Sequence, residues 1–175
     1  MKVFAIIRQK FFLPFYIIGK RVSGEGEIVV RKYQLYLIED EFAAHYFGRE
    51  RMFYQLFQEN ERAIGELKYI TRKQITYITK SIEVLKIHQL IQKQLGRIKG
   101  FSADHGTYSI EISGKLSTAK IEVFQDLISV VATGSYDAET MFFEVLRKCE
   151  SSFLAIDLDH QRFGWLKPIK ERKFV

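Results

Sequence analysis

The apolar positions of residues 40–60 predict one long helix that carries more aromatic surface than a core contact needs. At about 100° per residue, its apolar side chains fall on two neighbouring stripes. The first stripe holds Phe42, Tyr46, Phe53 and Phe57, and the second holds Ala43, Phe47 and Tyr54. One apolar stripe suffices to dock a helix on a core. The extra aromatic surface therefore predicts a partner, and our hypothesis is that this partner is a protein.

The chain on either side of this segment also follows recognisable periods. Residues 32–39 alternate and are rich in aromatic and branched side chains, which indicates a strand. Thr71 followed by Gln74 matches a capping box, so a short helix is expected to begin at Thr71. Ser81 is the expected N-cap of the next helix, whose apolar spacing runs to a stop near Gly96.

In the second half of the chain the period of two dominates. Asp137 is placed to cap one more helix over residues 138–150. Strands are predicted over residues 107–113, 119–124, 128–133, 152–157 and 162–166. Because strands and helices come in groups instead of alternating one by one, the sequence predicts an α+β fold with a mostly antiparallel or mixed sheet packed with helices. Residues 31–175 are expected to form a single domain, preceded by an N-terminal extension over residues 1–30.

Composition supports a folded domain, and the distribution of charge narrows its partners. The 175 residues are 47% apolar and 14% aromatic, enough for a sizeable core. The formal net charge of +6 lies at the ends: residues 1–31 hold six basic and two acidic side chains, and residues 166–175 hold four and one. Residues 32–165 hold 17 basic and 18 acidic side chains. Since binding to nucleic acid needs a basic footprint on the folded surface, direct binding is not expected.

The only cysteine, Cys149, excludes an intramolecular disulfide and a cysteine-based metal site. The cytoplasm is therefore the natural compartment. The apolar run of residues 11–18 is too short to span a bilayer, and Pro14 interrupts it as a membrane-surface helix. No membrane association is expected.

Candidate catalytic groups are few and poorly spaced. Glu41 and His45 lie four apart, but no second histidine completes a metal motif. His88, His105 and His160 have no nearby nucleophile in sequence, and Cys149 lies on the apolar face of its helix, as an inert core residue does. Phosphate loops and nucleophile elbows are absent from the sequence. We expect no enzyme activity, no metal and no cofactor.

Longer stretches of sequence resemble the SirA family, the sporulation inhibitors of replication. They are EFAAHYFGRE at residues 41–50, KQITYIT at 73–79, GSYDAETMFFEVL at 134–146, and GWLKPIKERKFV at 164–175. The resemblance runs from about Lys32 to the last residue and is loose between about Gln92 and Leu127. Nothing in the family corresponds to residues 1–30.

The resemblance implies a negative regulator of DNA replication initiation during sporulation. It implies binding to domain I of the initiator DnaA, by occlusion or remodelling of that domain and without chemistry. Carried over by motif, the contacts are Phe42 and Tyr46 on the first helix and Gln74 and Tyr77 on the second. The stripe of Ala43, Phe47 and Tyr54 is then expected to pack on the sheet. Phe53 and Phe57 are expected to be covered by the segment after Asn60.

Two explanations of the N-terminal extension and two competing functions stay open at the level of the sequence. One explanation of the extension is that residues 24–27, Gly-Glu-Gly-Glu, whose codons are purine-rich, are a translated ribosome-binding site. The true start is then Val29 or Val30. A genuine, membrane-directed extension is the other explanation. The competing functions are a nucleic-acid-binding protein that uses its basic termini and a small-ligand enzyme on an α+β scaffold.

Overall fold

The computed structural model describes residues 29–167. The extension expected over residues 1–30 therefore lies outside the described residues except for its last two positions, and so does the basic tail after Lys167. Within the described range, no helix has the length and apolar character needed to cross a membrane.

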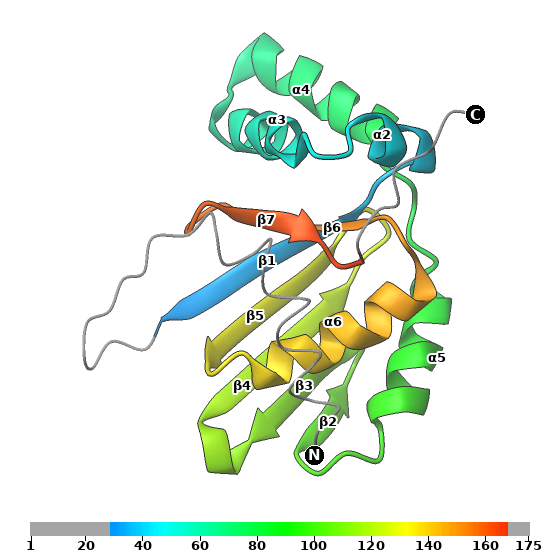
Figure 1. Ribbon diagram of the computed structural model, residues 1–175, viewed down its shortest axis with the longest axis vertical. Coiled ribbons are helices and arrows are strands. Elements are labelled where there is room, and N and C mark those ends of the chain that lie inside the picture. Colours follow the sequence, from blue (N-terminus) through cyan, green and yellow to red (C-terminus); the bar gives the residue numbers. More distant parts are fainter. Residues whose placement is uncertain (1–28, 168–175) are drawn as a thin grey trace.

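One antiparallel sheet of seven strands forms the centre of the fold (Figure 1). Its spatial order is β2-β3-β4-β5-β1-β6-β7, so the first strand of the chain lies inside the sheet, between β5 and β6. The strands are β1 (Val30–Leu37), β2 (Phe101–Asp104), β3 (Thr107–Ile112), β4 (Ser117–Val123), β5 (Ile128–Gly134), β6 (Phe153–Asp157) and β7 (Arg162–Trp165). The expected α+β class with a mostly antiparallel sheet is confirmed.

Helices cover the two faces of the sheet in separate groups (Figure 1). The first group contains α2 (Asp40–His45), α3 (Glu50–Arg62) and α4 (Gly65–Ile78). The second group contains α5 (Val84–Leu95) and α6 (Asp137–Cys149). A single turn of 3-10 helix, Ser113–Lys115, connects β3 to β4.

Strand β1 separates two hydrophobic cores because its side chains alternate between the faces of the sheet. Tyr33, Leu35 and Leu37 point to one face, whereas Tyr36 and Ile38 point to the other. The α6-side core includes Tyr33, Leu35, Leu37, Ile87, Ile91, Phe142, Leu146 and Phe153. The α3-side core contains Ile38, Ala43, Phe53, Tyr54, Phe57, Leu154, Ile156 and Phe163. Strand β6 is buried along its whole length because it contributes to both cores.

The single helix predicted over residues 40–60 is wrong, because the chain breaks between α2 and α3. Residues 46–49 form a turn, in which Gly48 adopts a φ of +74°. A left-handed residue ends an α-helix, and glycine adopts this conformation without a Cβ penalty. The break rotates the later positions of the segment relative to Phe42, so one continuous helical wheel does not describe them.

Two expected helix starts are also displaced. Thr71 lies in the interior of α4, which already begins at Gly65, and its hydroxyl donates to the Leu67 carbonyl within the helix (2.9 Å). Ser81 is not the N-cap of α5, because this helix begins only at Val84. Between Ser81 and the helix, the Ile82 backbone N–H donates to the Gln125 carbonyl (2.8 Å). The helix still ends at Gly96 as expected.

The remaining predicted elements are confirmed with small shifts of their ends, but Asp137 is not a cap, because it is the first residue of α6 and Tyr136 is the N-cap. Strand β2 was not predicted. Its sequence Phe-Ser-Ala-Asp carries little strand signal, and three of its four side chains are exposed. It is a short edge strand that the pairing with β3 holds in place.

Candidate functional site

The start of α2 and the end of α4 are joined by backbone hydrogen bonds. The Glu39 N–H donates to the Ile78 carbonyl (2.9 Å), and the Lys80 N–H donates to the Leu37 carbonyl (2.7 Å). Between them, Ile38 and Thr79 form an antiparallel bridge. Residues 40 positions apart in sequence are thereby fixed side by side at the end of β1.

This junction brings Phe42 of α2 against Tyr77 of α4. Their ring centroids lie 5.4 Å apart at 63°, an edge-to-face arrangement. Phe42 is half-buried and packs against the α3-side core, whereas Tyr77 remains 74% exposed. Such an aromatic pair contributes about 0.5–1.5 kcal/mol to stability, in addition to the contribution of the apolar area that it buries. One ring is therefore anchored in the core, and it supports a second ring that solvent reaches.

Two further residues were predicted for this surface, Tyr46 and Gln74. Gln74 is exposed one helical turn before Tyr77. Tyr46 is half-buried at the C-cap of α2. Its ring packs edge-to-face with the Phe53 ring, and the two ring centroids lie 5.6 Å apart. The structure thus places Phe42 and Tyr77 in contact and Gln74 on the same exposed side as Tyr77. Tyr46 lies one turn from Phe42 but is held partly by the core.

A single carboxylate stabilises the turn between α2 and α3. The Glu50 carboxylate accepts hydrogen bonds from the Gly48 N–H and from the Trp165 indole N–H, both at 3.0 Å. The Trp165 ring also packs edge-to-face against Phe53 at 5.7 Å. The position of α2 is thereby fixed to strand β7 as well as to the end of β1.

The expected division of the aromatic residues is partly wrong. Ala43 and Tyr54 are buried as expected, but Phe47 lies in the turn and is 42% exposed. Phe53 and Phe57 are buried as expected: Ile75 and Ile78 of α4, the helix after Asn60, pack on the same core, and rings from the sheet also cover them. Phe53 meets Trp165, and Phe57 packs on Tyr36 at 4.1 Å. The break at Gly48 explains the correction, because it turns α3 so that these rings face the sheet.

The outward face of α4 was missed by the sequence analysis. Leu67 and Ile70 are 46% and 44% exposed, and together with Gln74 and Tyr77 they form a line at spacings of three, four and three residues. The expected start at Thr71 hid this line, since its first two members lie before that position. The signal that was available was Gly65 after a polar stretch, which here begins the helix with a φ of +59°.

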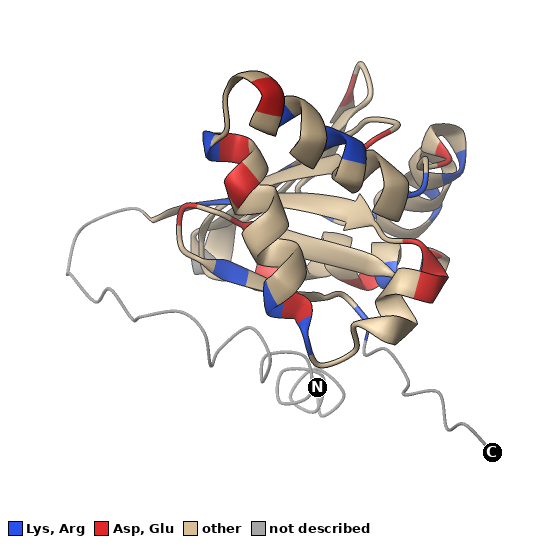
Figure 2. Cartoon of the chain, turned by 90° about the horizontal axis from the view of Figure 1, so that it is seen from above, with Lys and Arg blue, Asp and Glu red and all other residues tan. Residues whose placement is uncertain are grey.

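Beside this line lies an open depression whose lining includes two exposed cationic side chains, Arg72 and Lys73. It is lined by Glu39, Tyr69, Arg72, Lys73, Thr76, Tyr77 and Thr79. The Lys73 ammonium stands 4.4 Å from the centroid of the Tyr69 ring, a cation–π contact. Figure 2 looks down on this layer and shows acidic and basic positions interspersed along α3 and α4. The described surface of these helices is therefore no basic footprint for nucleic acid.

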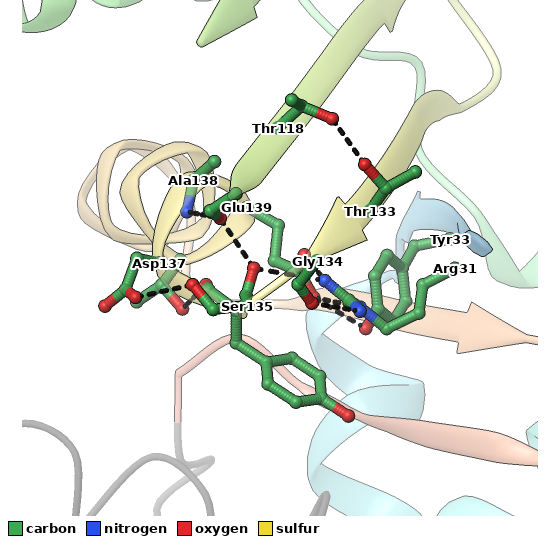
Figure 3. A network of polar contacts seen from close by, with 12 residues as sticks. Arg31, Tyr33, Thr118, Thr133, Gly134, Ser135, Asp137, Ala138 and Glu139 are labelled. Carbon is green, nitrogen blue, oxygen red and sulfur yellow. Dashed lines mark hydrogen bonds and ion pairs between the residues drawn. The ribbon is translucent and has the colours of Figure 1, made fainter. Parts of the chain in front are cut away.

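A buried ion pair on the opposite side of the molecule joins β1 to α6 (Figure 3). Arg31 donates from Nε and Nη2 to the two oxygens of Glu139 (2.8 and 2.5 Å), and the Tyr33 hydroxyl donates to the same carboxylate (3.0 Å). Burial raises the pKa of Glu139, while Arg31 acts to lower it. Breaking a buried pair by removing one partner costs about 3–5 kcal/mol. The pair has the contacts of a structural clamp between strand and helix.

The other titratable candidates also have structural partners. The His88 ring lies 2.8 Å from the Tyr108 hydroxyl, and the His160 ring lies 2.9 Å from the buried Asp157 carboxylate. Burial raises the pKa of the Cys149 thiol, which packs half-buried against the α6-side core. Glu41 and His45 are both exposed. Within residues 29–167, no three acidic, histidine or cysteine side chains are grouped as a metal site.

Comparison with known proteins identifies the family of the chain. The family model described as "Sporulation inhibitor of replication protein SirA" matches residues 31–170. The sporulation inhibitor of replication protein SirA of Bacillus subtilis (strain 168) is 43% identical over 147 residues, which cover 83% of this chain and 99% of that protein. The match spans every helix and strand described above. The chain therefore belongs to the SirA family.

Proposed function

We propose that the protein restrains the initiation of DNA replication during sporulation by binding domain I of the initiator DnaA in the cytoplasm. The relative's name supports the role in sporulation and replication. The contact surface proposed on this chain is formed by Phe42, Tyr46, Gln74 and Tyr77. The protein acts as a binding module and carries out no reaction.

The observation that carries this proposal is the Phe42–Tyr77 pair. Aromatic anchors that are supported from behind and exposed at the front are typical of binding hot spots. Tyr77 leaves most of its ring in solvent, and the backbone junction at Glu39 and Ile78 fixes it beside α2. The surface therefore offers apolar area at low cost in conformational entropy. Bound there, the protein would occlude or remodel the surface of domain I that it covers.

A titration of the purified protein against isolated domain I of DnaA tests the proposal. Tyr77→Ala and Phe42→Ala should each weaken binding by about tenfold or more, as hot-spot truncations do. Leu85→Ala is the matched control, because Leu85 is 77% exposed on α5, away from this surface, and its affinity should stay within twofold. Unchanged binding by Tyr77→Ala would reject the surface, and the absence of any binding to domain I would reject the partner.

The same family match supports the proposed domain boundary. It begins at Arg31, and the sheet begins at Val30. We propose that residues 31–175 form the binding domain and that residues 1–30 are an addition to it. Mass spectrometry of the native protein checks whether the cell makes that addition: a peptide covering residues 11–20 would reject a start at Val29 or Val30.

A further inference from the structure

We infer that the partner docks a helix along the whole outward face of α4, with an acidic side chain that enters the depression at Arg72 and Lys73. The inference rests on the proposed function, because it takes the same partner, but it adds a second half to the surface and a charge that the partner must carry.

The line of exposed side chains on α4 is long. Leu67, Ile70, Gln74 and Tyr77 lie on one side of the helix over ten residues, about 15 Å at 1.5 Å per residue. Spacings of three and four residues are those that pack one helix against another. The contacts expected from Phe42 and Tyr77 occupy only the C-terminal end of this line.

Leu67 and Ile70 lie outside the buried core of the monomer. Thr71 is the only residue of α4 that is fully buried. The helix is fixed instead by the Thr71 hydroxyl, which bonds the Asn60 side chain (3.1 Å), by the half-buried Ile75 and Ile78, and by the junction at its end. Leu67 and Ile70 therefore remain apolar on a surface that the monomer leaves in water.

The depression beside the line carries positive charge. Arg72 and Lys73 are exposed, and neither makes an ion pair with a side chain of residues 29–167. Glu39 is the one carboxylate that lines the depression, so two cations face one anion. A guanidinium and an ammonium beside two tyrosine rings suit a carboxylate on a protein ligand. The nearby acidic residues Asp40, Glu41 and Glu66 disfavour a polyanion such as a nucleic-acid backbone.

The test uses the full chain and isolated domain I of DnaA as the probe. The double variant Leu67→Ala/Ile70→Ala should bind about tenfold more weakly with an unchanged melting temperature, because both side chains are exposed. Affinity within twofold of the wild type would overturn the extended surface. If Tyr77→Ala still weakens binding in that case, the proposed function stands and only the extension fails.

The charge is tested separately with Arg72→Glu/Lys73→Glu. This variant should lose at least tenfold in affinity, and its binding should depend less steeply on salt concentration. Lys93→Glu/Lys99→Glu is the matched control, since both lysines are exposed on α5 and the loop after it, and it should stay within threefold. Equal effects of the two double variants would show a general charge effect and overturn the acidic contact. Recovery of binding by a domain I variant with one acid changed to lysine would identify the facing residue.

Discussion

Helices α4 and α6 have nearly the same length but opposite relations to the sheet. Of the 13 residues of α6, six are buried, including Phe142, Phe143, Val145 and Leu146. Of the 14 residues of α4, only Thr71 is buried. Both helices carry apolar side chains, so composition alone does not separate them. What separates them is that α6 buries its apolar side chains within the monomer, whereas α4 buries only Ile75 and Ile78 in part and leaves Leu67, Ile70 and Tyr77 mostly exposed.

The comparison shows two ways of stabilising a helix in one small domain. Helix α6 is stabilised by burial and by the ion pair of Glu139 with Arg31. Helix α4 is stabilised by the partly buried Ile75 and Ile78 and by hydrogen bonds: Lys68 donates to the Asn60 carbonyl, Thr71 donates to the Asn60 side chain, and the Glu39 N–H donates to the Ile78 carbonyl. Because hydrogen bonds supplement this limited burial, the side of α4 that carries Leu67, Ile70 and Tyr77 stays exposed in the monomer.

A matched pair of truncations tests the difference between α6 and α4 most directly. Phe142→Ala should lower the free energy of unfolding by about 3–5 kcal/mol, since it leaves a cavity in the α6-side core. Tyr77→Ala should lower it by only about 0.5–1.5 kcal/mol, the contact with Phe42, because most of the ring is in water. Urea unfolding measures both values. Similar losses for the two variants would show that α4 is a core helix after all.

The turn that separates α2 from α3 gives a smaller effect. Gly48→Ala should cost about 1–2 kcal/mol, the penalty for a non-glycine residue in the left-handed region. No atom lies within 4 Å of the added Cβ, so the cost is conformational and not steric. Gly114→Ala is the control, because Gly114 has equally open space without a positive φ, and it should be nearly neutral. Thermal unfolding of the two variants decides this.

An effect that is absent at neutral pH concerns the two faces of β1 at alkaline pH. Burial raises the pKa of Tyr36 to about 12, and burial together with the Glu139 carboxylate raises the pKa of Tyr33. Each phenol stays neutral in the folded protein while it ionises in the unfolded chain from about pH 10. The unfolded state then holds fewer protons, so the free energy of unfolding falls as pH rises above 10.

Tyr36→Phe should make that fall shallower by about 1 kcal/mol per pH unit between pH 10 and 12. Denaturant unfolding at several alkaline pH values measures the slope. Tyr77→Phe is the control, because Tyr77 is exposed, and its slope should match the wild type. An unchanged slope in Tyr36→Phe would contradict the burial of that hydroxyl.

The sequence predicted the sheet better than the helical layer above it. Alternating residues specify a strand with one buried face, and for β3, β4 and β5 the pattern was sufficient. The contact between Phe42 and Tyr77 was not predictable from spacing, because backbone pairing between residues 37–39 and 78–80 creates it. Their assignment to one surface came from the family resemblance instead.

The misassigned helix over residues 40–60 has a physical explanation. Its apolar spacing stayed close to helical across the break, so periodicity gave no warning. Gly48 was the available signal, since glycine often ends helices. The same reasoning applied to Gly65 would have started α4 earlier and would have placed Leu67 and Ile70 on it. Strand β2 carried no comparable signal, because its pairing partner β3 determines it.

The junction between Glu39 and Ile78 also has a consequence for the speed of complex formation. Since the sheet sets the spacing between α2 and α4 before any partner arrives, no rearrangement slows the encounter. The association rate constant should then be similar for the wild type and for variants that truncate Leu67, Ile70 or Tyr77. Their weaker affinities should instead appear as shorter lifetimes of the complex.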